Sequence, residues 1–312
     1  MQIVLLESVM RILKKAGFSM ANLADTKPRC FDVVAKRGDE LYLVKVLYNV
    51  DSLKPESAEE IKKLSRLLSA VPVIVGERFK NDFLERGVVY TRYGIPVVNL
   101  ATFYDYVVEN IPPLIYSAPG GYYVRIDGKK IREIREKLGI SIGDMAKRLG
   151  VSRRTAKKYE EDIDTNLETA AKIEELLGTQ VIKAIEFKSF VDYDLGEMEE
   201  SSEKTKFDET LVHLSEIGVK VHPVKQAPFD AVSLAEDELV LTGVKPVREI
   251  KRRAMIFGEI SRVTESRAAY ITEKDVKVNI RSVVFILKEE LGSITSAKDF
   301  ISLIDEKAKG EK

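Results

Sequence analysis

The sequence predicts two related α/β domains that flank a central domain made of helices. Three observations within its 312 residues support this prediction. A segment that begins at Phe31 recurs, with the same spacing, at Phe229. Between the two copies, residues 129–177 carry apolar side chains at helical spacing. Before the second copy, residues 192–206 are acidic and poor in apolar side chains, which indicates a linker.

The composition allows a buried core in each domain, because 45% of the residues are hydrophobic and the chain is long enough for two or three domains. We expect an α/β domain, a hairpin linker, a helical domain, an acidic linker and a second α/β domain. Their predicted ranges are 1–113, 114–128, 129–190, 191–206 and 207–312.

The first domain mixes helix and strand patterns. Its opening helix ends at Gly17, and a turn containing Gly38 joins two strands rich in β-branched and aromatic residues into a hairpin. The later segments alternate between helix and strand. The predicted helices are 3–15, 54–69 and 102–109, and the predicted strands are 31–36, 41–47, 71–75, 87–89 and 95–100.

The second α/β domain repeats the first at one ungapped offset. Upstream of the matched segment, a helix ends at Gly17 in one copy and at Gly218 in the other. Downstream, a helix over 247–260 and a strand over 268–271 follow in the order of the first copy. The matched pairs are Phe31 and Phe229, Asp32 and Asp230, Asp39 and Asp237, Glu40 and Glu238, Leu41 and Leu239, Leu43 and Leu241, and Val46 and Val244.

The central segment has the spacing of two helices that cross closely at a tight turn. Ala146 is small enough for two helix axes to approach, Gly150 accepts the positive φ that ends a helix, and Ser152 can cap the next helix. The predicted helices are 129–138, 142–149, 152–160 and 167–177. The apolar contacts between the two middle helices are predicted to come from Met145, Leu149, Val151, Ala156 and Tyr159, and a second set, Ile131, Ile134, Leu138, Ile173 and Leu176, is predicted to complete the core.

The charge of the chain is balanced overall but not locally. Fifty basic and fifty acidic residues give a formal net charge of zero. Residues 129–158, however, contain eleven basic side chains against three acidic ones, a net charge of +8. A basic segment of this kind is typical of a surface that neutralises nucleic-acid phosphates.

Other features point away from metal, redox and membrane chemistry. The single cysteine, Cys30, fits a reducing cytosol and reads as a small buried hydrophobe. His213 and His222 lack metal-ligand spacing and read as structural, so we expect no metal and no cofactor. The apolar start is too short for a signal peptide and no run approaches a membrane span, which predicts a soluble, cytoplasmic protein without a membrane partner.

The central segment resembles a helix-turn-helix of the Cro/cI (XRE) type, in which a glycine before the first motif helix, here Gly139, and a closing pair, here Tyr159 and Glu160, recur. With the preceding stretch GGYYVRIDGKKIREIRE, it is similar to an archaeal family of helix-turn-helix transcriptional regulatory proteins. The resemblance implies a cytoplasmic DNA-binding regulator. One departure is Ala156, where such motifs often carry a larger aliphatic residue.

The recognition helix would be residues 152–159, whose first turns enter the major groove when such a motif docks. Double-stranded DNA is the predicted partner, bound by a homodimer, and the sequence identifies no small-molecule effector. The expected base contacts come from Ser152, Arg153, Arg154 and Lys157, and the expected phosphate contacts from Lys158, Lys147, Arg148 and Thr155.

The first domain resembles the PD-(D/E)XK nuclease fold, in which a helix glutamate, an aspartate and an acid-x-Lys pair hold a metal ion. Glu7, Asp32 and Lys45 match three of these positions, but Leu43 replaces the central acid. In the second copy Asp230 remains, while Leu241 and Gly243 stand where acid and lysine are expected. We therefore expect two related restriction-endonuclease-like domains with degenerate sites and no catalytic residues.

Two alternatives stay open from the sequence. The chain is expected to be a sequence-specific transcriptional regulator, but a metal-dependent DNA nuclease or a DNA-repair accessory protein would use the same modules. The tyrosine-rich hairpin over 114–128 is favoured as a structured linker over a DNA-contacting wing.

Overall fold

The computed structural model describes residues 1–24, 26–191, 208–244, 250–276, 280 and 282–310. Most of the acidic linker predicted over 191–206 therefore lies outside the described residues. The chain forms two compact units, and the division between them runs through the predicted first domain. The first unit contains Met1, Leu47–Asp51 and Ile74–Phe190, and the second contains Gln2–Val46, Ser52–Val73 and Val191–Lys312.

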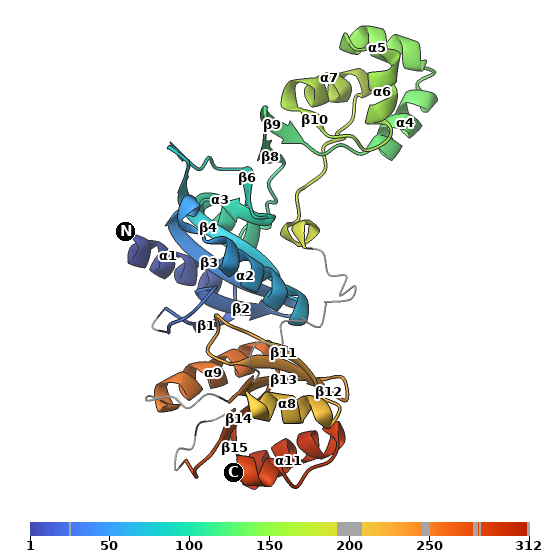
Figure 1. Ribbon diagram of the computed structural model, residues 1–312. Coiled ribbons are helices and arrows are strands. Elements are labelled where there is room, and N and C mark those ends of the chain that lie inside the picture. The colour runs from blue at the N-terminus through green and yellow to red at the C-terminus, as the bar shows by residue number, and fades with distance from the viewer. Residues whose placement is uncertain (25, 192–207, 245–249, 277–279, 281, 311–312) are drawn as a thin grey trace. The chain divides into compact units, whose positions relative to one another are not determined.

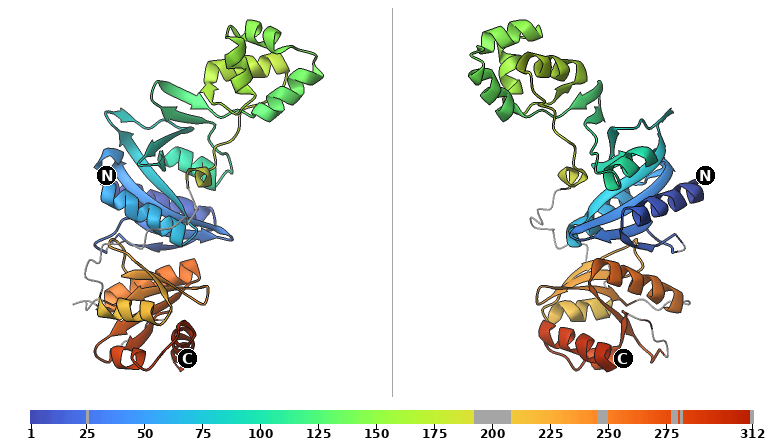
Figure 2. Two further views of the ribbon diagram at one scale, coloured as in Figure 1. Left: turned by 45° about the vertical axis from the view of Figure 1, so that its right-hand side comes forward. Right: turned by 180° about the vertical axis from the view of Figure 1, so that it is seen from behind.

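The N-terminal part of the second unit is a three-stranded antiparallel arrangement with two helices. Figure 2 shows the two helices on opposite faces of these strands. Ser19 pairs with Lys36 between the first two strands, and Val33 pairs with Val44 in the predicted hairpin, which is confirmed. The elements are α1(Gln2–Lys15), β1(Ser19–Asn22), β2(Val33–Arg37), β3(Glu40–Asn49), which runs on past Val46, and α2(Pro55–Leu67).

The C-terminal part of the second unit follows the same order of elements. Its sheet has the strand order β11-β12-β13-β14-β15, with antiparallel pairing up to β13 and parallel pairing beyond it. The predicted helix over 247–260 is confirmed from residue 250 onward and continues to Thr264, while 247–249 lie outside the described residues. The predicted strand at 268–271 is confirmed with one more residue at each end. The elements are α8(Glu209–Glu216), β11(Lys220–Pro223), β12(Ala231–Ala235), β13(Glu238–Gly243), α9(Ile250–Thr264), β14(Arg267–Thr272), β15(Val284–Leu287), α10(Lys288–Leu291) and α11(Ala297–Gly310).

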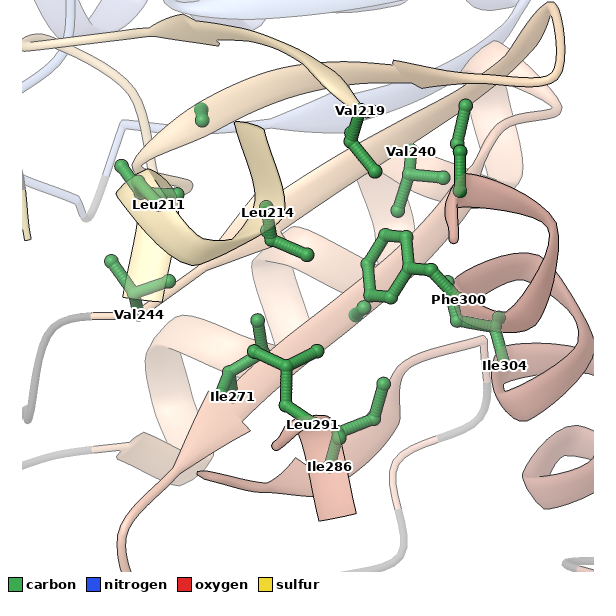
Figure 3. Close-up of a cluster of buried hydrophobic side chains, with 14 of the residues drawn as sticks. Leu211, Leu214, Val219, Val240, Val244, Ile271, Ile286, Leu291, Phe300 and Ile304 are labelled. Atoms are coloured by element: carbon green, nitrogen blue, oxygen red, sulfur yellow. The ribbon is translucent and has the colours of Figure 1, made fainter. Parts of the chain in front are cut away.

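Apolar side chains pack on both faces of this sheet. Ile271 on β14 faces the cluster drawn in Figure 3, where Leu214 of α8 and Phe300 of α11 meet over the sheet. Tyr270, the preceding residue, packs edge-on against Phe257 of α9. Because successive strand residues point to opposite faces, α8 and α11 cover one face and α9 covers the other.

The first unit begins with a mixed sheet. Ile74 pairs with Val97 in parallel, and Tyr90 pairs with Val97 in antiparallel fashion on the other side. The predicted strand at 71–75 is longer than expected, and the short strand after it was missed because two residues carry no periodic signal. The elements are β4(Val71–Phe79), β5(Asp82–Phe83), β6(Val88–Arg92), β7(Ile95–Val98) and α3(Leu100–Val107).

The predicted hairpin extends this sheet into the helical domain. Val88 of β6 pairs with Ile115 of β8, β8 pairs with β9, and β9 pairs through Val124 with Thr165 of β10. The helices gather beyond the hairpin, as the green ribbon of Figure 1 shows. The elements are β8(Ile115–Ala118), β9(Gly121–Val124), α4(Gly128–Lys137), α5(Ile142–Leu149), α6(Arg153–Tyr159), β10(Thr165–Asn166), α7(Leu167–Leu177) and the 3-10 helix η2(Phe187–Phe190).

The helical domain has one small core. Its four helix predictions are confirmed to within a residue or two at each end. The predicted core position Leu138 is wrong, because its side chain is 54% exposed at the end of α4. The buried members of the core are Val124, Ile126, Ile131, Met145, Leu149, Tyr159, Ala170, Ile173, Leu177 and Val181.

Candidate nucleic-acid interface

The turn between α5 and α6 is fixed by local hydrogen bonds at each helix end. Ser141 caps α5 by accepting a bond from the Asp144 amide at 3.0 Å, and Ser152 caps α6 by accepting one from the Thr155 amide at 3.0 Å. Gly150 ends α5 with a φ of 69°, the left-handed conformation that glycine adopts without strain. These bonds set where α6 begins and leave its first turn open to solvent.

The two middle helices bury one face and expose the other. Ala146 and Ala156 are 3% and 0% exposed at their crossing, so the small residue at 156 is part of a closed contact. Tyr159 is also buried beneath the end of α6. The exposed face carries the remaining predicted positions, which are Lys147, Arg148, Ser152, Arg153, Arg154, Lys157 and Lys158.

Thr155 differs from the other predicted contacts. Its side chain is half-buried, and its hydroxyl shares a hydrogen bond with the Ser152 hydroxyl at 2.9 Å. The same Ser152 oxygen accepts the Thr155 amide. Thr155 therefore has a capping role in the structure, whatever contact it makes with a ligand.

Arg153 lies back over the preceding helix. A Cβ placed on Gly143 of α5 would lie 3.0 Å from Nη2 of Arg153 and 3.1 Å from its Nε. The glycine thus leaves room for this guanidinium to rest along α5. Sequence reasoning missed this role of Gly143, because no spacing rule links a glycine in one helix to an arginine in the next.

Not all of the local positive charge faces solvent. Arg135 is 8% exposed, and its Nε donates to Glu160 at 2.5 Å while Nη1 donates to the Ile140 carbonyl at 2.7 Å. The bond to Glu160, outweighing burial, raises the pKa of Arg135. On α4, Arg132 also pairs with Glu136. Lys129 and Lys137 of α4 are exposed, as are the cations of α5 and α6, whereas Arg135 ties α4 to the end of the candidate recognition helix.

The hairpin of β8 and β9 contacts the helical domain through side chains and strand pairing. Tyr116 of β8 donates to Asp164, in the loop after α6, at 2.7 Å and stacks on Tyr123 of β9 with ring centroids 5.9 Å apart. Burial, followed by the bond to Asp164, raises the pKa of Tyr116, so its phenol stays a donor at neutral pH. The hairpin is thus paired to both of its neighbours in the sheet.

A second connection returns from the helical domain to α3. The Asp127 amide donates to Val181 at 2.8 Å, which closes the base of the domain. Phe187 then stacks on Tyr106 of α3 at 4.0 Å, and the Tyr106 hydroxyl donates to Glu186 at 2.7 Å. Two chain segments, not one, therefore hold the helix-turn-helix within the first unit.

Of the three nuclease remnants predicted in the first domain, Asp32 and Lys45 lie in contact, whereas Glu7 lies apart from them. Asp32 is 2% exposed, and Arg29 Nε lies 2.6 Å from its Oδ1 while Lys45 Nζ lies 3.3 Å from its Oδ2. The Val46 amide donates to Oδ2 at 2.8 Å. Glu7 is exposed on α1 and, within the described part of the chain, takes no part in this group. The carboxylate of Asp32 is thus neutralised by two side-chain cations.

The second copy repeats this arrangement around Asp230. The Asp230 amide donates to Thr242 and its Oδ2 accepts from Val244, matching the bonds that Asp32 makes to Val44 and Val46. Its Oδ1 accepts from Arg253 at 2.9 Å. The register of these backbone bonds is the same at both aspartates, which is what a repeat of the sequence should give.

Neither copy offers a divalent cation a set of ligands. Leu43 and Leu241, at the positions of the central acid, are 0% exposed in the core. A side chain on Gly243 would meet the Tyr270 ring at 2.8 Å, so a lysine has no space there. Within the described residues, no three histidine, cysteine or acidic side chains come together as a metal site. The residues present do not fit the metal that the nuclease fold implies.

Variants of Asp32 test whether this residue has a structural role or a catalytic one. We expect Asp32→Asn to lower the free energy of unfolding by about 1–3 kcal/mol, because Arg29 and Lys45 lose a buried charged acceptor. The exposed Glu7→Gln variant should unfold like the wild type. Thermal and urea unfolding measure the difference. Cleavage of duplex or branched DNA with Mg²⁺ or Mn²⁺ that Asp32→Ala abolishes would contradict this structural role.

The neighbourhood of Asp32 is also covered from the C-terminal part of the second unit. The Cys30 amide donates to the Gln226 carbonyl at 2.9 Å, and Ser57 donates to the Gln226 side chain at 2.8 Å. Lys63 of α2 donates to the Pro223 carbonyl at 2.6 Å. Burial raises the pKa of the Cys30 thiol to about 12, so the cysteine is an inert core residue, as expected.

The two histidines are in keeping with structural roles. His222 is half-buried in β11, and burial, followed by the charges of Lys63 and Lys220, lowers its pKa. His213 Nε2 lies 3.2 Å from the Leu291 carbonyl. None of the helices in the described ranges combines the length and the apolar character that crossing a membrane requires.

The geometry defines a helix-turn-helix protein that carries a nuclease-like domain. Family models agree: residues 2–113 match a PD-(D/E)XK superfamily domain, and residues 131–182 match a helix-turn-helix. Both resemblances seen in the sequence are confirmed by these matches.

Relatives that match nearly the whole chain identify its family. A protein of Archaeoglobus fulgidus named as an HTH-type transcriptional regulatory protein is 62% identical over 304 residues, 97% of this chain and 98% of the relative. Relatives with the same kind of name from Methanoculleus marisnigri and Natronomonas pharaonis are 38% and 36% identical, covering 96% and 98% of this chain and 98% of each relative. The chain belongs to this archaeal family of HTH-type transcriptional regulatory proteins. No solved structure matches it.

Proposed function

We propose that the protein is a transcriptional regulator that binds specific double-stranded DNA through the exposed face of α5 and α6. One observation carries this proposal. Six lysine and arginine side chains stand exposed around a capped helix start, while the opposite face of the same helices is buried. The names of the archaeal relatives support the same function.

The proposed contacts divide into two kinds. Side chains on the first turns of α6 are placed to reach base edges, where an arginine can bind guanine O6 and N7 with two hydrogen bonds. The others position the protein on the backbone. We assign Ser152, Arg153, Arg154 and Lys157 to bases and Lys147, Arg148, Lys158 and Thr155 to phosphates.

We propose that the nuclease-like domain is a scaffold and not an enzyme. Its support is the pairing of Asp32 with two cations and the burial of Leu43 where a ligand would be needed. We further propose that residues 207–312 form a second domain of the same fold, so that it and residues 1–113 flank the helix-turn-helix in the chain. The matching bonds of Asp32 and Asp230 support this arrangement. Such a regulator would act in the cytoplasm, where the chromosome is.

The proposed DNA-bound form is a homodimer on a two-fold site. The seven residues of α6 can make only a few base contacts, each worth about 1–3 kcal/mol, whereas specific recognition needs about 4–10 kcal/mol over random DNA. Two copies would double the readout. We expect sedimentation of the complex to give two chains per duplex and a bound sequence with inverted half-sites. One chain per duplex on an asymmetric site would contradict the dimer.

The regulatory role is tested in cells of the source organism. We expect a genome-wide occupancy map to show discrete peaks near promoters that share one sequence, and transcripts next to those peaks to change when the protein is removed. Uniform occupancy without a shared sequence, together with unchanged transcripts, would contradict a regulator and favour a DNA-repair or chromatin accessory protein.

A further inference from the structure

A second group of cations in the first unit lies outside the helix-turn-helix. It is built where β4 runs into the short β5 and where β6 turns into β7. Arg78 of β4 is paired with Phe83 of β5 across this hairpin, and Arg92 is the last residue of β6. Lys80 lies in the turn between β4 and β5. With Phe79 and Tyr93, these residues form what we call the arginine–aromatic surface.

Each cation of this surface lies near an aromatic ring. The Arg78 guanidinium carbon is 4.2 Å from the centroid of the Phe83 ring, and that of Arg92 is 4.6 Å from the Tyr93 ring. Lys80 Nζ is 5.8 Å from the Phe79 ring. Contact with a ring holds a guanidinium in one plane and reduces the freedom it would lose on binding a ligand. The rings therefore preorganise the donors.

The surface is short of acceptors. Among the described residues, Arg78 Nε and Arg92 Nε are buried without a hydrogen-bond partner, and no ion pair involves Arg78 or Lys80. Arg92 has one long ion pair, in which its Nη1 lies 3.8 Å from Oδ1 of Asp51, and the Oδ2 of the same carboxylate accepts the Lys80 amide at 2.6 Å. Buried donors are normally satisfied, so these unpaired atoms show that the chain's own acceptors leave the donors of this surface unmatched, and the exposed ammonium of Lys80 is open to an acceptor from outside the chain.

Arg86 on the same segment shows the contrast. Its Nε and Nη2 both donate to Asp105, each at 2.7 Å, so a carboxylate of the chain already occupies its donor fork. Within the described residues, Arg86 has a carboxylate partner, whereas no carboxylate pairs with Arg78 and its Nε has no hydrogen-bond partner. The unpaired donors are thus a property of this one surface and not of every arginine nearby.

Exposed rings beside the cations narrow the class of ligand. Phe83 is 59% exposed and Tyr93 is 37% exposed, so both rings are accessible to a ligand that contacts the cations. Cations interleaved with exposed aromatic rings suit a nucleic-acid strand, whose phosphates accept from the cations and whose bases or sugars lie on the rings. A simple anion would bind to the cations alone and would not use the exposed ring faces for stacking.

We propose that the arginine–aromatic surface is a second nucleic-acid binding site, which takes backbone phosphates on Arg78, Lys80 and Arg92. The choice of nucleic acid as the polyanion rests on the proposed function. The site belongs to the same compact unit as the helix-turn-helix, and the strand series β6, β8, β9 and β10 connects the two. Arg92 lies four residues along β6 from the pairing of Val88 with Ile115, which is about 13 Å of strand.

The site is tested by salt-dependent DNA binding of the full chain. The probes are a fluorescein-labelled duplex of random sequence and the corresponding single strand, with binding followed by anisotropy. For each phosphate-binding cation that is removed, we expect the slope of log Kd against log salt to fall by about 1, and affinity at 0.15 M salt to fall about 5-fold. The test variants are Arg78→Gln, Lys80→Gln and Arg92→Gln.

Arg86→Gln is the matched control, because it removes a cation of the same segment that already has a carboxylate partner. Lys80→Gln changes an exposed turn residue, so it keeps the test valid if Arg92→Gln unfolds the protein. Arg78→Lys keeps the charge but loses the planar fork, and we expect an intermediate loss. Equal effects of Arg78→Gln and Arg86→Gln, or unchanged slopes in all variants, would overturn the site.

The outcomes distinguish this site from the proposed function. The same substitutions made together with Arg153→Ala and Lys157→Ala should lower the affinity further by the same factor, because separate sites contribute independently. Wild-type protein that binds no DNA would contradict the proposed function itself. Wild-type protein that binds DNA with an unchanged slope in Arg78→Gln and Lys80→Gln would contradict only the second site. A larger loss for the single strand than for the duplex would identify the strand form it takes.

Discussion

Replacing Arg153 with alanine is expected to weaken binding to a selected duplex by between about 5-fold and about 150-fold, equivalent to about 1–3 kcal/mol. The side chain is exposed at the first turn of α6 and has room along Gly143, so its loss leaves the fold intact and removes a base contact. Lys157→Ala should show a loss in the same direction. Fluorescence anisotropy at fixed salt measures both.

The pattern across DNA sequences is as informative as the size of the loss. Arg153→Ala should relax the preference at one or two positions, whereas Lys158→Ala should weaken all sequences alike and reduce the salt slope by about 1. Lys172→Ala is the control, because this exposed lysine of α7 pairs with Glu168 and is not among the proposed contacts. Unchanged binding in Arg153→Ala and Lys157→Ala would show that α6 is not the recognition helix.

The second large effect is expected at the buried ion pair of the helical domain. Glu160→Ala removes the closer of the two carboxylates that pair with the buried Arg135 guanidinium and leaves Glu136 at 3.3 Å, which should lower the free energy of unfolding of this domain by about 3 kcal/mol, the lower end of the range for a broken buried pair. Because Glu160 is the C-cap of α6, the variant should also loosen the recognition helix. Amide hydrogen exchange over residues 129–182 reports the stability of this domain separately from the rest of the chain.

The control for this variant is an exposed pair in the same domain. Glu168 is 79% exposed and pairs with Lys172 one turn along α7, so Glu168→Ala should change stability by no more than about 0.5 kcal/mol. Comparable losses in the two variants would mean that the Arg135–Glu160 pair has no special structural role. A selective loss of DNA binding without any loss of exchange protection would point to a direct contact instead.

The helix boundaries around the turn were predictable because their signals are local. Ser152 and Gly150, the two residues named from the sequence, each act on backbone groups within three or four residues, so the sequence alone places them; the cap at Ser141 was not predicted. Short strands such as β1 and β11 were missed, because four residues become a strand only through a partner far along the chain. Their existence depends on tertiary pairing, which a local pattern does not contain.

The sequence predicted which residue types make up the candidate site, but it did not predict which side chains contact one another. Helical spacing placed Leu138 in the core, and Arg135 was one of the eleven basic residues counted in the basic segment. In the structure Leu138 is exposed and Arg135 is buried. The cause is Glu160, which supplies a buried counter-charge from another helix. The loss of the central acid at Leu43 followed from the resemblance to the nuclease motif, whereas the contact of Arg29 with Asp32 is visible only in the structure.

The central claim is that α6 reads a defined DNA sequence, and in vitro selection from a randomised duplex pool tests it most directly. At 0.15 M salt, we predict that the wild-type chain enriches one motif with inverted half-sites, and that the Arg153→Ala, Lys157→Ala variant enriches none or a relaxed one. Enrichment of the same motif to the same extent by both proteins would contradict the claim.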